Sequence, residues 1–80
     1  MKARIMVRLK EEVLDAPGKA VVERLQNLGF SEVKDARVGK LIELDVQSAD
    51  RENALARLQL MCEKLLVNDA IEEFDIQSLD

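Results

Sequence analysis

The sequence predicts a two-layer α+β sandwich of ferredoxin-like type, with element order β-α-β-β-α-β and both helices on one face of an antiparallel sheet. The first observation behind this fold class is periodicity: apolar residues recur at every second position in four segments and at helical spacing in two others. The second is charge. The outward positions of the first strand carry Arg4 and Arg8, whereas those of the third and fourth strands are acidic. Because opposite charges on adjacent strands attract, the first strand is expected between the other two. The acidic positions are Glu43, Asp45, Glu73 and Asp75.

The first strand is predicted over residues 3–9. Its inward positions would be Ala3, Ile5, Val7 and Leu9, which alternate with mostly basic residues. An alternation of this kind is typical of a strand with one buried face.

A helix is predicted from the residue after Asp15 to about Leu28. Asp15 can cap its N-terminus, and Pro17 suits the first turn, where its missing N–H would have no partner in any case. Gly29 is well placed to end the helix in the left-handed conformation, with Phe30 folding back on the last turn. Val21, Leu25 and Leu28 would form the apolar stripe of this helix.

A hairpin is predicted next, with strands over 32–38 and 42–46 joined by a three-residue turn at Gly39-Lys40-Leu41. Face parity requires this length, since a two-residue turn would bury the charge of Arg37. In the three-residue version, Val38 lies opposite Ile42 and Ala36 opposite Leu44 on the core side. Arg37 lies opposite Glu43 on the outer side, and Gly39 adopts the left-handed conformation.

A second, longer helix is predicted over residues 50–67, capped by Ser48 or Asp50. A last strand follows over 71–77, with Phe74 and Ile76 inward. The core stripe of the helix is Ala54, Leu55, Leu58, Met61, Cys62, Leu65 and Leu66. A second apolar stripe, formed by Ala56, Leu60 and Val67, falls roughly opposite the first and is a candidate partner surface.

Composition excludes several classes of function. The chain has 80 residues, no histidine and one cysteine, so it lacks a Ser-His-Asp or Cys-His pair and the usual zinc ligands. Its formal charge of −4 and two aromatic residues argue against a nucleic-acid partner. We expect a single domain over residues 1–80, with no membrane span and no secretory signal. The lone cysteine, Cys62, fits a reducing, cytoplasmic environment and is expected to be an inert core residue.

The short length of the chain favours association with another chain. A chain of 80 residues buries only about 60–65% of its unfolded surface, so its own core is marginal. No disulfide or metal site is available to strengthen it, and contact with another chain is the remaining route to robust stability.

Three stretches of the chain resemble one known family. They are residues 13–21 (VLDAPGKAV), residues 28–44 from LGF through VGKLIEL, and residues 61–68 (MCEKLLVN) followed by IEEF at 71–74. Their order and spacing resemble the PurS family, the small subunits of phosphoribosylformylglycinamidine synthase, over nearly the whole chain. One departure is Ala16, which stands between Asp15 and the proline that the family places directly after its aspartate.

The resemblance implies a non-catalytic subunit in the fourth step of de novo purine synthesis. In that family a large subunit uses ATP and magnesium to activate the amide, a glutaminase subunit releases ammonia, and the small subunit bridges them and supports ammonia transfer. It implies a cytoplasmic homodimer that joins this assembly and holds no catalytic, cofactor or metal site of its own. The residues we expect at partner contacts are Arg37, Gly39, Lys40, Glu43, Leu60 and Val67.

Two alternatives remain open from the sequence. An ACT-like regulatory dimer that binds an amino acid between subunits would share the fold. A small enzyme of acylphosphatase type would share the topology, but it would need an arginine in the loop between the first strand and the first helix, and residues 10–18 contain none.

Overall fold

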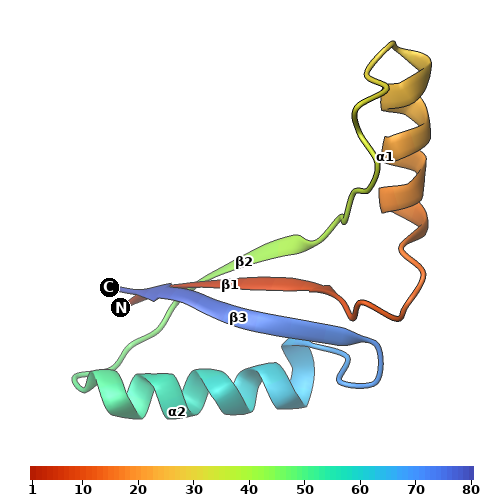
Figure 1. Ribbon diagram of the computed structural model, residues 1–80. Coiled ribbons are helices and arrows are strands. Elements are labelled where there is room, and N and C mark those ends of the chain that lie inside the picture. The colour runs from red at the N-terminus through yellow and green to blue at the C-terminus, as the bar shows by residue number, and fades with distance from the viewer.

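The computed structural model describes residues 1–80 as a three-stranded antiparallel sheet with two helices. Helix α2 lies along one face of the sheet, whereas α1 projects away from the end of the sheet (Figure 1). The predicted fold class, ferredoxin-like α+β, is confirmed in its central part, with one strand fewer than expected. The elements are β1 (Lys2–Leu9), α1 (Ala16–Asn27), β2 (Lys40–Asp45), α2 (Arg51–Met61), the π-helical turn η1 (Cys62–Leu66) and β3 (Glu72–Leu79).

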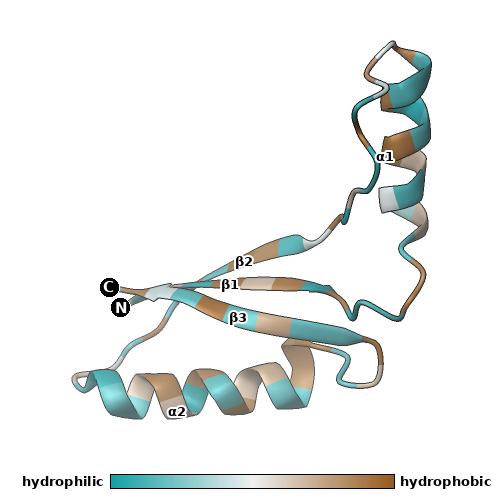
Figure 2. Ribbon diagram, viewed as in Figure 1, coloured by the Kyte–Doolittle hydropathy of each residue, from teal (hydrophilic) through white to brown (hydrophobic).

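The core lies between the sheet and α2. Strand β1 is central in the order β2-β1-β3, and its inward side chains Ile5 and Val7 are fully buried against Leu58 of α2. Figure 2 shows apolar and polar residues interleaved along α2. The complete buried cluster is Ala3, Ile5, Val7, Ala54, Leu58, Cys62, Val67 and Leu79. A core this small agrees with the marginal stability expected from the length.

The charge argument for strand order is confirmed by the register. Arg4 pairs with Glu43 across β1 and β2, with 4.0 Å between Nε and Oε2. Arg8 pairs with Glu73 across β1 and β3, at 2.8 Å between Nε and Oε1. Both ion pairs are exposed, so each contributes only about 0.2–1 kcal/mol, but together they favour this arrangement of strands.

Helix α1 begins and ends where the sequence predicts. Asp15 caps its N-terminus, and Gly29, with φ of 103°, ends it. The amide of Gly29 donates to Gln26 and that of Phe30 to Leu25, which together form the Schellman motif. The predicted core stripe is wrong, however. Leu28 is 74% exposed because no part of the sheet lies beneath α1.

The predicted hairpin is also wrong. Residues 30–39 form no strand, and Lys40 and Leu41 are not in a turn but belong to β2, opposite Val7 and Met6. Gly39 does not have a positive φ. Its small size serves close packing instead, since a Cβ there would lie 2.5 Å from the carbonyl oxygen of Val7. The chain therefore passes straight through Gly39 into β2.

The C-terminal end of the second helix shows that the predicted positions of Leu65 and Val67 are wrong. Asp50 caps α2, with its carboxylate accepting from the amide of Glu52 at 3.1 Å. At the other end, the amide of Val67 bonds to the carbonyl of Cys62, which is the wider π-helical spacing. This turn moves Leu65 out to 84% exposure, and the chain leaves the helix at Val67, which is buried in the core. A regular helix of 100° per residue had predicted the reverse, with Leu65 in the core and Val67 exposed.

The molecule is elongated, with principal extents of 51 × 25 × 14 Å. Its radius of gyration is 16.0 Å, whereas a compact chain of this length has about 12 Å. Its accessible surface is 6028 Å², against about 4,850 Å² for a folded monomer of 9.0 kDa. The projecting α1 and the segment after it account for the elongated shape (Figure 1). No helix has both the length and the apolar character needed to cross a membrane.

Cys62 allows a test of the core. Its side chain is fully buried, and burial raises the pKa of its thiol, with the charge of Glu63 adding to the effect. We expect alkylation at pH 8–9 to be much slower than for an unfolded control, because the reactive thiolate is disfavoured. Cys62→Ala should fold, whereas Cys62→Ser, which buries an extra hydroxyl, should lose about 1–3 kcal/mol in urea unfolding at matched protein concentration. Equal stability of the two variants would contradict the buried placement.

Candidate interaction surfaces

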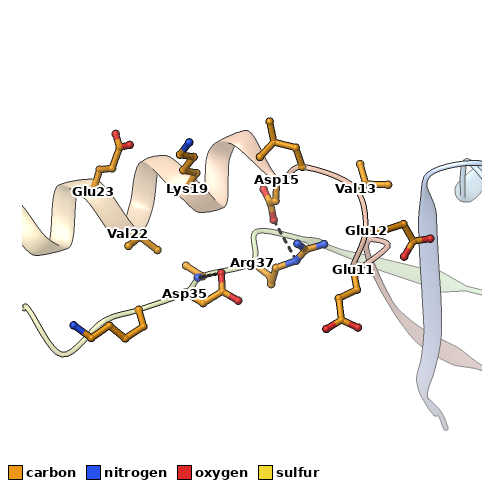
Figure 3. Close-up of a pocket in the computed structure, with 12 residues that line it drawn as sticks. Glu11, Glu12, Val13, Asp15, Lys19, Val22, Glu23, Asp35 and Arg37 are labelled. Atoms are coloured by element: carbon orange, nitrogen blue, oxygen red, sulfur yellow. Dashed lines mark hydrogen bonds and ion pairs between the residues drawn. The ribbon is translucent and has the colours of Figure 1, made fainter.

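The most constrained polar group in the molecule is the buried carboxylate of Asp15 (Figure 3). One of its oxygens accepts from the amide of Gly18 at 2.9 Å, which is the helix cap. The other accepts from the amide of Val38 at 2.8 Å, and Arg37 Nε lies 3.8 Å from it. Asp15 therefore joins the start of α1 to the segment that leads into β2, a role beyond the predicted capping.

Arg37 ties the same region to the end of β1. Its Nη2 donates to the carbonyl oxygens of Leu9 and Lys10, both at 2.8 Å. Gly18 completes the packing, since a Cβ there would lie 2.3 Å from the carbonyl oxygen of Ala36. We call this set of contacts between Asp15, Arg37 and the neighbouring backbone the clamp. It holds three chain segments together at the base of α1.

The electrostatics of the clamp favour a permanent charge. The hydrogen bond from Val38 lowers the pKa of Asp15 most, followed by that from Gly18. Burial opposes them with a smaller effect, and the guanidinium of Arg37 makes the smallest contribution, again lowering the pKa. A carboxylate stabilised in this way stays ionised near neutral pH. The clamp is therefore structural, and Asp15 is unsuited to acid–base catalysis.

A cleft of about 620 Å³ opens beside the clamp, between α1 and the segment after it. Its lining carries both signs of charge, with Glu11, Glu12, Glu23 and Asp35 as well as Lys19 and Lys34. In Figure 3 the glutamates point in different directions, and no two carboxylates converge on a common point. No group of three or more Cys, Asp or Glu side chains is placed to hold a metal ion. The cleft has the chemistry of a contact surface.

A second hollow, of about 490 Å³, is mainly apolar. It lies between β2 and the outer side of α2, with Leu44 from the strand and Leu60 and Leu65 from the helix region. Arg57 and Lys64 form a basic rim. We call it the groove; its remaining lining residues are Met61 and Leu66. Because Leu60 (44%) and Leu65 (84%) are exposed in a chain with so small a core, the groove is a candidate surface for association.

The six predicted contact residues do not form one surface. Arg37 belongs to the clamp and is not on the outer sheet face, where the hairpin prediction placed it. Glu43 pairs with Arg4 on that face, and Lys40 reaches Glu72 at 3.7 Å. Leu60 lies in the groove, but Val67 is buried in the core, so its place on a partner surface was wrong. Gly39 lies at the end of the clamp segment, beside Val7.

Sequence reasoning missed Leu65 and the second bond of Asp15. The exposure of Leu65 depends on the π-helical turn, which has no clear sequence signal. The bond from Val38 to Asp15 joins residues 23 positions apart and required knowledge of where the chain goes after α1.

Comparison with known proteins gives the family. The sequence model described as "PurS: Phosphoribosylformylglycinamidine (FGAM) synthase" matches residues 2–80. The chain belongs to the PurS family. It is 42% identical over 73 residues to the PurS subunit of Bacillus subtilis, covering 91% of this chain and 86% of that protein. It is 43% identical over 79 residues to the PurS subunit of Synechocystis, covering 96% and 79%.

Solved PurS structures have the same architecture. The PurS subunit of phosphoribosylformylglycinamidine synthase from Thermotoga maritima superposes with a TM-score of 0.89 at 33% identity, covering 98% of this chain and 90% of that one. A chain in the structure of PurLQS from Thermotoga maritima superposes with a TM-score of 0.85 at 30% identity, covering 99% of each. The protein is thus a subunit of phosphoribosylformylglycinamidine synthase, an enzyme of purine biosynthesis. This assignment replaces the ACT-like and acylphosphatase-type alternatives.

The clamp predicts a specific pH dependence. Because the folded pKa of Asp15 lies below its usual value of 3.8, its charge stabilises the fold at pH 5–8, and this stabilisation is lost as pH falls below 3.8 through the folded pKa. Asp15→Asn keeps the size of the side chain but removes the charge. We expect a lower thermal midpoint than wild type at pH 7 and a difference that narrows below pH 4.

Asp35→Asn is a matched control, because Asp35 is exposed and accepts only from the adjacent amide of Ala36. An Asp15→Asn midpoint equal to that of wild type at pH 7 would show that the charge of Asp15 does not stabilise the fold.

Proposed function

We propose that this PurS chain is a non-catalytic adaptor that bridges the ATP-dependent amidotransfer subunit and the glutaminase subunit and supports ammonia transfer between them. The observation that carries this proposal is the match over 99% of both chains to a component of PurLQS from Thermotoga maritima. A chain that superposes so fully on a component of an assembly has the shape required to occupy the corresponding place.

The physical need for such an adaptor follows from the chemistry of ammonia. Ammonia released into water at neutral pH is diluted and mostly protonated, and the ammonium ion is not a nucleophile. Holding the site of release and the site of use in a fixed, enclosed relation raises the effective concentration of the free base. A small rigid protein with two or more contact surfaces can supply that relation with no reactive group of its own.

The distribution of residues in this chain supports that division of labour. The one carboxylate with a shifted pKa is held by the clamp, and the one thiol is buried. What the chain offers on its surface is contact area in the groove and on α1. ATP, magnesium and the nucleophilic cysteine then belong to the partner subunits, and we propose that this chain binds no cofactor.

We further propose that the chain acts in the cytoplasm as a homodimer. The support for a dimer is physical: the accessible surface exceeds that of a compact monomer of this mass by about 1,200 Å². Standard dimer interfaces bury about 800 Å² per partner. The excess is thus enough for a stable interface.

Reconstitution tests the adaptor role. The purified chain is mixed with the large and glutaminase subunits, and amidine formation is measured with glutamine and, separately, with ammonium salt. We expect omission of this chain to lower the glutamine-driven rate on the order of tenfold or more while leaving the ammonium-driven rate nearly unchanged. Equal glutamine-driven rates with and without the chain would defeat the proposal.

A variant pair refines the test. Leu65→Glu places a charge in the exposed part of the groove, whereas Asn53→Glu places the same charge on an exposed position of α2 outside it. We expect the first to impair association and the second to behave as wild type in sedimentation velocity of the mixed subunits. If both variants showed the same loss of association, the groove would have no specific role in binding the partner subunits.

A further inference from the structure

The C-terminal end of α2 carries two aliphatic side chains of which only one is buried. Leu65 is 84% exposed, whereas Val67 is 7% exposed and belongs to the core. The π-helical turn η1 decides which of them is inside, because the amide of Val67 bonds to the carbonyl of Cys62 at the wider spacing. We call this arrangement the π register.

A regular helix through the same residues would exchange the two side chains. Leu65 follows the fully buried Leu58 by about two α-helical turns, so it would lie on the same side of the helix, toward the core. Val67 follows Leu58 by about two and a half turns and would face solvent on the opposite side. We call this arrangement the α register. Each register buries one aliphatic side chain at this end of the core and exposes the other.

Two effects favour the α register. Leucine has one methylene more than valine, so burying Leu65 in place of Val67 removes more apolar surface from water. A regular turn would also return the backbone hydrogen bonds at the end of α2 to the spacing found in the rest of the helix. Because both effects oppose the observed state, other contacts hold the π register.

Those contacts come from the loop that joins η1 to β3. The amide of Asn68 donates to Oε1 of Glu72 at 2.8 Å, and the amide of Glu72 donates to the carbonyl oxygen of Asn68 at 2.7 Å. Oε2 of Glu72 lies 3.7 Å from Nζ of Lys40 on β2. We call these contacts of Glu72 the latch. A change to the α register rotates the residues after the turn by about 100°, which carries Asn68 away from Glu72 and opens the latch.

We propose that η1 is a two-register switch, in which the end of α2 interconverts between the π register and the α register and the latch favours the first. Leu65 lines the groove in the π register and leaves it in the α register. A partner that contacts Leu65 therefore selects the π register, since it gains those contacts in that state only. This consequence rests on the proposed adaptor role, whereas the exchange of Leu65 and Val67 does not.

A double-mutant cycle tests the exchange. Val67→Asn places a polar side chain that is too short to reach water from the core, so the variant should fold in the α register with Leu65 as the buried replacement. Leu65→Ser alone removes an exposed side chain and should lower the thermal midpoint by no more than about 3 °C. In the Val67→Asn background the same substitution removes the replacement, and we expect a further fall on the order of 10 °C at matched protein concentration.

Leu28→Ser is the matched control in both backgrounds. Leu28 is 74% exposed at the end of α1 and has no alternative place in the core, so its effect should not depend on Val67→Asn. Equal effects of Leu65→Ser with and without Val67→Asn would overturn the switch, because Leu65 would then stay outside when Val67 is replaced. Glutamine-driven turnover that still depends on the chain in that case would leave the adaptor role standing.

Thiol labelling follows residue 65 directly and covers the case in which Val67→Asn does not fold. In a Cys62→Ala background, Leu65→Cys should react with a thiol reagent at the rate of an exposed cysteine. Val67→Thr, which keeps the shape of valine and buries one hydroxyl, shifts the balance toward the α register. Glu72→Gln weakens the latch and shifts it in the same direction.

The two changes together should protect the thiol. With Val67→Thr and Glu72→Gln combined, we expect labelling of Leu65→Cys to slow on the order of fivefold, because the exposed register becomes the minor one. Glu73→Gln in place of Glu72→Gln is the matched control and should slow labelling less, since the carboxylate of Glu73 lies outside the latch. A labelling rate unchanged by the Glu72→Gln combination would contradict the switch.

Discussion

The straight passage of the chain through Gly39 is the constraint on which the rest of the structure depends. Lys40 and Leu41 continue the pairing with β1 as far as Val7, so the backbone has no residues left with which to turn. A side chain at Gly39 would collide with the carbonyl oxygen of Val7, so this position accepts only glycine. Because the chain does not turn, α1 leaves the sheet, and the molecule keeps an open strand edge and an apolar groove.

The clamp holds the base of α1 in a fixed position. If α1 were joined to the sheet by two unsupported connections, it would sample many orientations, and any partner that bound it would have to order it first. Asp15 and Arg37 instead join three segments at the base of α1 through bonds to backbone groups. A pre-ordered α1 lowers the entropy cost of association, so apolar contact area is converted more fully into affinity.

The sequence predicted those features that depend on neighbours along the chain or on a repeating pattern. The cap at Asp15, the end of α1 at Gly29, the inward faces of β1 and β3 and the pairing of Arg4 and Arg8 with acidic strands all have local or periodic signals. Three features did not. The π-helical turn reverses Leu65 and Val67 without a marker residue, and the role of Arg37 depends on distant carbonyls. The hairpin failed for a different reason: its face parity was consistent with a closed turn, but parity does not reveal that Lys40 and Leu41 pair with β1.

The open shape of the chain also limits its stability. A monomer of 80 residues that leaves its first helix off the sheet has a core of only eight buried apolar residues and gives up much of the stability available to it. The apolar area left outside is then available to other chains, so folding stability and association draw on the same contacts. For the adaptor role proposed above, this sharing means that binding to the partner subunits would also add to the stability of the folded chain.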